Sequence, residues 1–355
     1  MSPSSIALKI RVKRDRISTI LRSFWALYTL PKEQVESFLA AYDIFDHDWS
    51  REDELRRVMG KYYYNSIKRK LVNYYNVLNQ LCSLGQIEKM YIPPAIDLNR
   101  SIIENQILFE RRMGHDLGLG KDTLALDIGC GRGRVATGMA AYSGTRVIGI
   151  NIDPVQVAIG NQFALAHRLE NRCQFGIGDM NDLPLPFPDC DFDAIYHIQA
   201  LTYSRDLGGL FRDIYRLLKP GAKFASLDWV TLPGYDPTNT HHADLMRRIK
   251  PLIGAIGTPT SAHYVSLLEQ AGFRVLISEN PSVDGMQAPL IENAERFYRR
   301  LAWGLNWGMR CKILPRHFQL LFDRLRKDGE ALVEADRLRL VTTSHYIVAQ
   351  KPAGG

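Results

Sequence analysis

The chain has 355 residues, of which 46% are hydrophobic, and a formal net charge of +7 at pH 7. This length suits one large domain or two modest ones, and the apolar share excludes an unfolded, low-complexity chain. The charge is moderate and no aromatic-plus-basic recognition module accompanies it, so we expect no nucleic-acid partner.

The cysteines and the apolar runs indicate the cellular location of the protein and whether it has disulfides, metal sites or membrane-spanning helices. The five cysteines are scattered, and no pair of them has the spacing of metal ligands. We therefore expect no metal, no disulfide framework and a reducing, cytoplasmic location. Residues 1–30 lack a signal-peptide pattern, and no stretch stays apolar over the roughly 20 residues that a spanning helix needs.

Residues 1–98 are predicted to form a helical N-terminal extension, because they contain no strand-like alternation and end at the breaker over residues 91–94. Within it, residues 5–30 interleave six basic side chains with apolar ones, at helical spacing from Ile17 onward. This segment is expected either to pack as an ordinary helix or to lie on an anionic membrane surface. A targeting or nucleic-acid role for it is the third alternative.

Residues 99–280 are predicted to form an α/β core, because strand and helix patterns alternate there. We expect a Rossmann-like, mostly parallel seven-stranded sheet, completed by residues 341–355. Residues 281–340 are predicted to be a helical lid inserted before the last strand. The expected helices span residues 101–117, 154–168, 207–218 and 262–271, and one begins near residue 135. The expected strands span residues 123–128, 146–150, 173–178, 192–197, 222–230, 273–278 and 345–350, with a turn over residues 219–221 before the fifth.

The segment over residues 124–134 predicts a ligand-binding turn. It is an apolar strand that runs into three glycines, Gly129, Gly131 and Gly133. Glycines leave the backbone bare where a ligand must touch it, and they tolerate positive φ. Dehydrogenases usually space such glycines as G-x-G-x-x-G, whereas this chain has D-x-G-x-G-x-G starting at Asp127. That form resembles the S-adenosylmethionine (SAM) loop of class I methyltransferases.

Residues after the next two strands match the needs of SAM. Asn151 is expected to accept a hydrogen bond from a ribose hydroxyl through its amide oxygen, with Asp153 as a substitute. Asp179 suits the adenine amino group and Met180 suits the ring face. Each alone has a plain structural interpretation, such as a helix cap, but their order along the chain favours a SAM site. The expected cofactor contacts are Asp127, Gly129, Cys130, Gly131, Gly133, Asn151, Ile152, Gln156, Asp179, Met180 and His197.

The region over residues 72–236 resembles the sterol C-24 methyltransferase family. Two positions depart from the family pattern, because Gln199 stands in place of a glutamate and Tyr203 in place of a histidine. Residues 78–85 also lack the aromatic, glycine-rich character that the family has there. The resemblance implies C-methylation of an isoprenoid, terpenoid or sterol-like acceptor. The departures imply that the residues around the acceptor differ from those of the family. The resemblance rests on residues 74–77, 126–133, 149–151, 227–229, 235–236 and 345–352.

In the reaction that this resemblance implies, an alkene attacks the sulfonium methyl group and a base then removes a proton from the resulting cation. Positioning, exclusion of water and aromatic faces supply the catalysis. The expected catalytic residues are His197, Tyr203 and Asp228, and the expected acceptor contacts are Gln199, Tyr203, Trp229 and Tyr235. Plain alternatives are core positions for His197 and Trp229, a capping role for Glu104 and a solvated loop for His241 and His242.

Three other functions stay open at this point. The fold could serve cyclisation or isomerisation without net methyl transfer, O- or N-methylation of a small molecule, or a scaffold with a vestigial pocket. The expected partners are an apolar small molecule, a second copy of the chain, and an intracellular membrane that the N-terminal helix touches from the cytoplasmic side.

Overall fold

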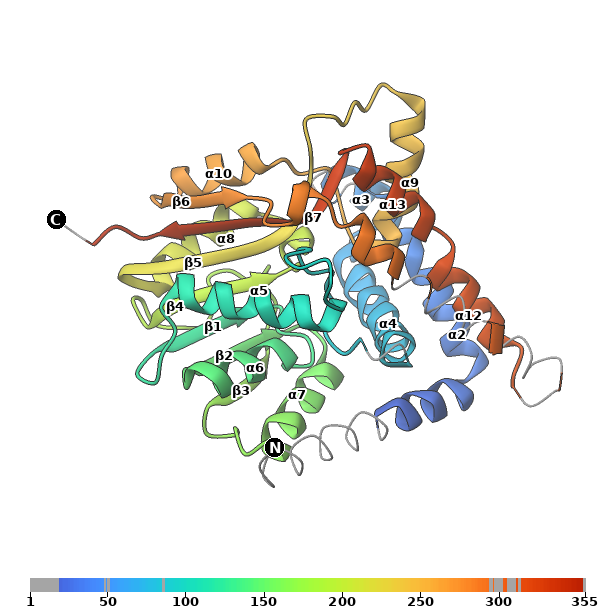
Figure 1. Ribbon diagram of the computed structural model, residues 1–355, viewed down its shortest axis with the longest axis horizontal. Helices are drawn as coiled ribbons and strands as arrows, with labels where there is room; N and C mark the ends of the chain where they lie inside the picture. Colours follow the sequence, from blue (N-terminus) through green and yellow to red (C-terminus); the bar gives the residue numbers. More distant parts are fainter. Residues whose placement is uncertain are drawn as a thin grey trace.

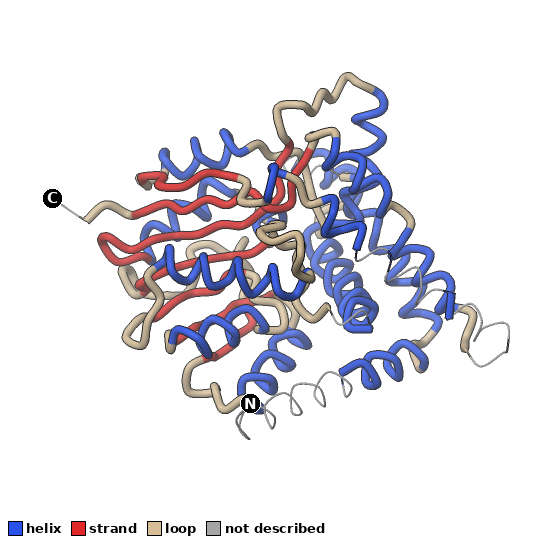
Figure 2. Tube along the Cα trace, viewed as in Figure 1, coloured by secondary structure: helices blue, strands red, loops and turns tan. Residues whose placement is uncertain are grey.

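The computed structural model describes residues 19–47, 49, 52–84, 87–293, 296, 303–304, 311 and 314–353. Its centre is one seven-stranded sheet in the order β3-β2-β1-β4-β5-β7-β6, in which β7 runs antiparallel to both neighbours (Figures 1 and 2). The predicted α/β fold with a mostly parallel sheet is confirmed. The strands are β1 (Leu124–Ile128), β2 (Arg146–Asn151), β3 (Cys173–Ile177), β4 (Phe192–Ile198), β5 (Leu218–Thr231), β6 (Arg274–Glu279) and β7 (Val341–Gln350).

Helices cover both faces of the sheet, which is why most residues of its central strands β1 and β4 are buried. On one face α5 (Ile102–Leu117), α6 (Arg134–Ser143) and α7 (Pro154–Ala166) share a core with the strands. On the other face α8 (Leu207–Leu217) and α10 (Ser261–Gln270) do the same. Parallel strands therefore present their carboxyl ends together at one edge of this sandwich.

The described part of the N-terminal extension is mainly helical and packs at that edge. It comprises a helix over residues 19–28, α2 (Lys32–Ala40), the 3-10 helix η1 (Ala41–Asp46), α3 (Glu52–Met59) and α4 (Tyr63–Leu84).

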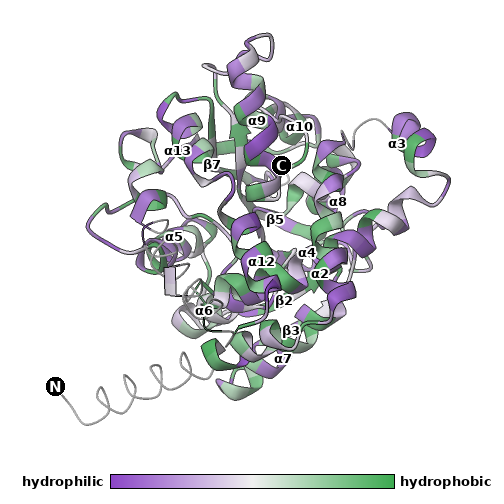
Figure 3. Ribbon diagram, turned by 90° about the vertical axis from the view of Figure 1, so that its right-hand side faces the viewer, coloured by the Kyte–Doolittle hydropathy of each residue, from purple (hydrophilic) through white to green (hydrophobic). Residues whose placement is uncertain are grey.

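The inserted segment before the last strand joins the same layer, although it is far away in the sequence. Its helix α12 (His317–Arg326) contributes Phe318 to the core around Phe38 and Tyr74. Figure 3 shows α2, α4 and α12 together on the side that faces the strand ends. Helix α13 (Gly329–Arg337) packs on α9 (Thr240–Ile253) beside them.

Three local expectations were wrong. Residues 219–221 do not precede the fifth strand but form an irregularity inside β5, between the pairs Phe192–Leu218 and Ala194–Lys223. The last strand begins at residue 341, four residues earlier than predicted. His241 and His242 lie in the first turn of α9, where the Asn239 side chain accepts hydrogen bonds from both of their N–H groups.

Glu104 closes a capping box with Ser101 at the start of α5, which is the plain alternative for that residue. Within the described ranges, no helix combines the length and the apolar character that crossing a membrane requires.

Candidate active site

The glycine turn after β1 is bare because its neighbours approach too closely for side chains. The N–H groups of Gly129 and Cys130 both donate to the Ile150 carbonyl of β2, at 2.9 and 3.0 Å. A Cβ on Gly129 would lie 2.6 Å from the Ala200 side chain, and one on Gly133 would lie 2.5 Å from the Phe175 ring. All three glycines have positive φ, between +54° and +77°. The turn is thus held tightly, with its backbone facing a cavity.

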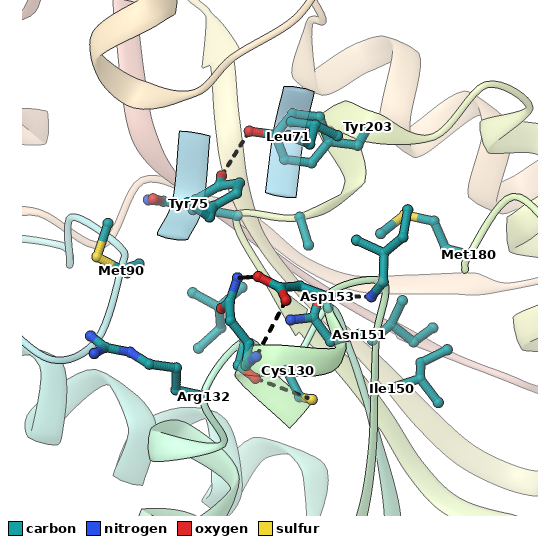
Figure 4. Close-up of a pocket in the computed structure, with 18 of the residues that line it drawn as sticks. Leu71, Tyr75, Met90, Cys130, Arg132, Ile150, Asn151, Asp153, Met180 and Tyr203 are labelled. Carbon is teal, nitrogen blue, oxygen red and sulfur yellow. Dashed lines mark hydrogen bonds between the residues drawn. The ribbon is translucent and has the colours of Figure 1, made fainter. Parts of the chain in front are cut away.

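This cavity, which we call the cofactor pocket, lies at the carboxyl ends of the strands (Figure 4). The ends of β1, β2 and β4, the segment after β3 and one side of α4 form its wall. Most of the residues predicted from the sequence as cofactor or acceptor contacts line it. They are Asp127, Gly129, Cys130, Gly131, Asn151, Ile152, Gln156, Asp179, Met180, Gln199 and Tyr203.

Two ionisable groups in this wall are strongly desolvated. Burial raises the pKa of Asp127 to about 7, so its carboxyl changes charge near neutral pH. Burial also raises the pKa of the neighbouring Cys130 thiol well above its usual value. Cys130 is therefore a small packed side chain and not a nucleophile.

Asn151 lines the pocket with its side-chain amide. Its amide oxygen accepts from the N–H of Ile152 at 3.0 Å, while its buried Nδ2 has no hydrogen-bond partner among the described residues. The Nδ2 group of Asn151 is thus available to donate to a ligand, and the acceptor role of its oxygen stays a prediction. Asp153 caps α7 and accepts from the side-chain Nε2 of Gln156 at 3.1 Å.

Asp179 is held by helix α4, which sequence reasoning did not place here. The Tyr64 hydroxyl donates to its carboxylate at 2.8 Å and Lys68 Nζ pairs with it at 2.5 Å. Burial opposes ionisation of this carboxyl, but hydrogen bonds from Lys68, from the N–H of Asn181 and from Tyr64 outweigh it and lower the pKa. The tyrosine-rich run at the start of α4 was a sequence signal for contacts with the pocket. The sequence does not reveal that Tyr64 bonds to Asp179, which lies 115 residues further along the chain.

Two predicted catalytic residues, His197 and Asp228, lie in the core beneath the pocket instead of in its wall. His197 has no exposed surface, its Nε2 is 2.6 Å from Ser226 Oγ, and burial lowers its pKa to about 3. Burial raises the pKa of Asp228 to about 7, and its carboxylate accepts from the N–H groups of Leu201 and Trp229. The structure therefore corrects their predicted place: both fix the strand ends from below.

Three other predicted contacts are also displaced from the pocket wall. Trp229 is buried beside α9 and donates through Nε1 to Thr202 Oγ1 at 3.3 Å, and Tyr235 packs at the edge of the same core. Gly133 is the N-cap of α6 and makes room for Phe175. Of these three residues only Trp229 lies on a strand, where side chains alternate between the two faces and its own is turned toward α9.

A second cavity, which we call the apolar chamber, adjoins the cofactor pocket. Five residues line both spaces: Tyr75, Lys89, Met90, Tyr91 and Gln199. The rest of its wall comes from α4, residues 87–102, α9, residue 291, α12 and α13, and is almost entirely aliphatic or aromatic. Sequence reasoning missed most of this wall, because the residues come from segments more than 200 positions apart.

Two tyrosines meet where the two cavities join. The hydroxyls of Tyr75 and Tyr203 are 2.7 Å apart, and Tyr203 donates to the Gly254 carbonyl at 2.7 Å. Since the Tyr203 hydroxyl donates its single hydrogen to that carbonyl, the Tyr75 hydroxyl is the donor in the hydrogen bond between the two tyrosines. Burial raises the pKa of Tyr75 to about 12 and that of Tyr203 well above its ordinary value, so both stay neutral phenols.

Gln199 forms the wall between the cavities. Its Nε2 donates to the carbonyls of Ile92 at 3.0 Å and Thr343 at 2.6 Å, and its Oε1 accepts from the N–H of Ile92 at 3.3 Å. Its backbone has a φ of +49°, which is costly for a residue with a Cβ. The amide thus clamps β4, β7 and the segment after α4, and it is an anchor in this structure.

Comparisons with known proteins agree with this geometry. A family model described as a methyltransferase domain matches residues 126–226. A solved geranyl diphosphate C-methyltransferase from Streptomyces coelicolor has the same fold, with a TM-score of 0.52, 18% identity, and coverage of 70% of this chain and 82% of that one. Fold and pocket therefore define a class I SAM-dependent methyltransferase, and SAM is its cofactor.

Two curated relatives identify the family. The chain is 30% identical to the sterol 24-C-methyltransferase erg-4 of Neurospora crassa, over 68% of this chain and 69% of that protein. It is 29% identical to the sterol 24-C-methyltransferase ERG6 of Saccharomyces cerevisiae, over 90% of this chain and 86% of that protein. The chain belongs to the sterol 24-C-methyltransferase family.

Proposed function

We propose that the protein methylates a carbon atom of a neutral, apolar acceptor of the isoprenoid or sterol type. The observation that carries this proposal is the apolar chamber, which adjoins the cofactor pocket and shares Tyr75 and Gln199 with it as lining residues. An acceptor in the chamber would lie against the wall that the two cavities share. The names of the relatives, sterol 24-C-methyltransferases, favour the same acceptor class.

The charge of the chamber favours a neutral acceptor over a prenyl diphosphate. Lys89 is the one formally charged residue among the described residues that line it, and its Nζ is bound at 2.6 Å to both carboxylate oxygens of Glu110. Among the described residues, no group of three or more His, Cys, Asp or Glu is placed to hold a metal ion. A diphosphate entering this chamber would thus meet no free cation to offset its charge.

SAM fits the residues of the cofactor pocket. The glycine turn offers a backbone without side chains, and the unpartnered Nδ2 of Asn151 offers a donor. When bound, SAM supplies an electrophilic methyl group. The chain positions the acceptor, keeps water from the reacting carbon and offers the neutral rings of Tyr75 and Tyr203 to a developing positive charge. We propose these two tyrosines as catalytic residues and Gln199 as the anchor between the cavities.

The test is methyl transfer from radiolabelled SAM to three sets of acceptors. Neutral sterols and triterpenes should yield labelled, organic-extractable products that have gained one CH2 unit. Geranyl diphosphate should yield none. Label transfer to geranyl diphosphate alone would overturn the neutral acceptor, and conversion of an acceptor with unchanged mass would favour the cyclisation or isomerisation alternative.

We also propose that the protein touches an intracellular membrane from the cytoplasm. Leu21, Trp25 and Tyr28 follow one another at helical spacing on the helix over residues 19–28, with exposed fractions of 62%, 63% and 37%. Exposed aromatic residues beside a basic sequence are typical of helices that lie in the headgroup region of anionic bilayers. The expected homodimer stays a prediction.

A further inference from the structure

Helix α4 and the glycine turn each place an unsatisfied polar group in the wall of the cofactor pocket, and they meet where Arg132 donates to Ser83, four residues after Asn79 on α4. Arg132, between the second and third glycines, and Asn79, on α4, both line the pocket and are buried, with 8% and 3% of their surfaces exposed. Among the described residues, Arg132 Nε and Asn79 Oδ1 have no hydrogen-bond partner. One is a cationic donor and the other a neutral acceptor.

The guanidinium of Arg132 also lacks an anion. Its terminal nitrogens donate to Ser83 Oγ at 3.2 and 3.3 Å and to the Glu88 carbonyl at 3.1 Å. The Glu88 carboxylate is taken by Arg134 at 2.8 Å, and no carboxylate of the described residues pairs with Arg132. Burial, together with the charge of Arg134, lowers the pKa of Arg132 to about 10, so it remains charged at neutral pH. A buried charge without a counter-ion is costly, so this one calls for an anionic ligand group.

The position of the pair matches one part of the cofactor. In Figure 4, Arg132 lies below Met90, at the opposite side of the pocket from Met180, while Asn151 lies between them. Met180 and Asn151 stand where the adenine and the ribose are proposed to bind. The far end, near Arg132, is left for the amino-acid tail, which carries one carboxylate and one ammonium group.

We propose that Arg132 and Asn79 hold the amino-acid tail of SAM, with the α-carboxylate on the Arg132 guanidinium and the α-ammonium on Asn79 Oδ1. This inference rests on the use of SAM as cofactor and adds two binding residues to the site. It also makes the N-terminal extension part of the cofactor site, because Asn79 belongs to α4. The tail then fixes the direction in which the methyl group points.

Calorimetry with the full-length protein tests the inference through ligands that differ only in the tail. S-adenosylhomocysteine has the complete tail, 5′-methylthioadenosine lacks it, and decarboxylated SAM lacks only the carboxylate. Arg132→Met should weaken S-adenosylhomocysteine binding by about 10- to 100-fold, as loss of a charged hydrogen-bonded pair does, and should leave methylthioadenosine binding within about twofold. Binding of decarboxylated SAM should also be unchanged in this variant.

Two further variants complete the design. Asn79→Leu should weaken both S-adenosylhomocysteine and decarboxylated SAM, because both carry the ammonium group. Arg248→Met is the matched control, since that guanidinium pairs with Asp328 and lines neither cavity. Its ratio of S-adenosylhomocysteine to methylthioadenosine affinity should equal that of the wild type.

The outcomes separate this inference from the cofactor assignment. If folded Arg132→Met retains wild-type preference for S-adenosylhomocysteine over methylthioadenosine, the inference is wrong and SAM binding stands. Wild-type protein that binds neither ligand would overturn the cofactor assignment and this inference with it. If Arg132→Met does not fold, Arg132→Lys replaces it in the test, because a lysine keeps the charge but lacks the planar set of donors. The preference of this variant for S-adenosylhomocysteine over methylthioadenosine should fall several-fold.

Discussion

At the scale of single residues, the side-chain amide of Gln199 holds together two segments of the site, those that contain Ile92 and Thr343. Both hydrogens of its Nε2 are donated to carbonyl oxygens, those of Ile92 and Thr343. A carboxylate at this position would turn two attractive contacts into repulsions between oxygen atoms. The glutamine is therefore required by the packing of this chain, whatever the related enzymes place there.

We predict that Gln199→Glu lowers the free energy of unfolding by about 3 kcal/mol, through two lost hydrogen bonds and two buried carbonyls left unpaired. Urea unfolding measures the change. Gln174→Glu, on the exposed side of β3, is the control and should stay within about 0.5 kcal/mol of the wild type. A Gln199→Glu variant as stable as the wild type would show that the amide clamp does not form.

Asp127 gives the site a dependence on pH. Its pKa of about 7 means that the carboxyl is neutral in more acid solution and negative above neutrality. SAM is a cation at its sulfonium group, so the negative form should bind it more tightly. We predict about tenfold weaker SAM binding at about pH 6 than at about pH 8.

Calorimetry across that range, with two variants, checks the prediction. Asp127→Asn should bind weakly and almost independently of pH. Asp122→Asn, which changes an exposed carboxylate just before β1, should keep the wild-type profile. An unchanged pH profile in Asp127→Asn would assign the titration to another group.

At the scale of the elements, helix α4 connects the extension to the sheet through Lys68 and Tyr64 on Asp179. Asp179 has a lowered pKa, so this contact stabilises the fold above the unfolded pKa of about 4 and is lost as the pH falls through the lower folded value. We predict that Lys68→Met costs about 1–2 kcal/mol at neutral pH, since the pair is partly exposed.

Denaturant titrations at several pH values measure this cost. The difference between wild type and Lys68→Met should shrink as the pH falls below about 4, because protonated Asp179 no longer pairs. Lys32→Met removes a lysine that is 86% exposed in its ion pair with Glu36, and should change stability by less than about 0.5 kcal/mol. Equal costs for the two variants would contradict the role of α4 as a fixed wall.

The elements also explain what the sequence could predict. Two of the three glycines after β1 and the polar residues after β2 and β3 line the pocket, because the carboxyl ends of parallel strands meet at one edge. His197 and Trp229 do not, because a strand turns successive side chains to opposite faces and sequence alone does not say which face a given residue takes. Tyr75 and Asn79 were missed because a long helix reveals its buried stripe but not the partner 128 residues away, Tyr203.

At the scale of the whole molecule, the N-terminal helix and the apolar chamber belong to one helical layer on the sheet edge. We predict that the protein binds vesicles of mixed phosphatidylserine and phosphatidylcholine, and that Trp25→Ala weakens binding about tenfold through lost apolar burial. Trp303→Ala is the control, since Trp303 is also exposed, at 76%, but lies outside that helix.

Sedimentation with the vesicles measures both variants. Added salt should weaken binding, because basic residues contribute to it. Equal losses for Trp25→Ala and Trp303→Ala would place the membrane contact elsewhere, and no loss for either would contradict it.

Helix α4 is a wall of both cavities, with Asn79 on the cofactor side, Leu78 on the acceptor side and Tyr75 on both. A movement of α4 would therefore alter both spaces together. We expect the release of the two products to be coupled and slower than methyl transfer. Rapid mixing should accordingly give a burst of product equal to one equivalent of protein, followed by a slower linear phase.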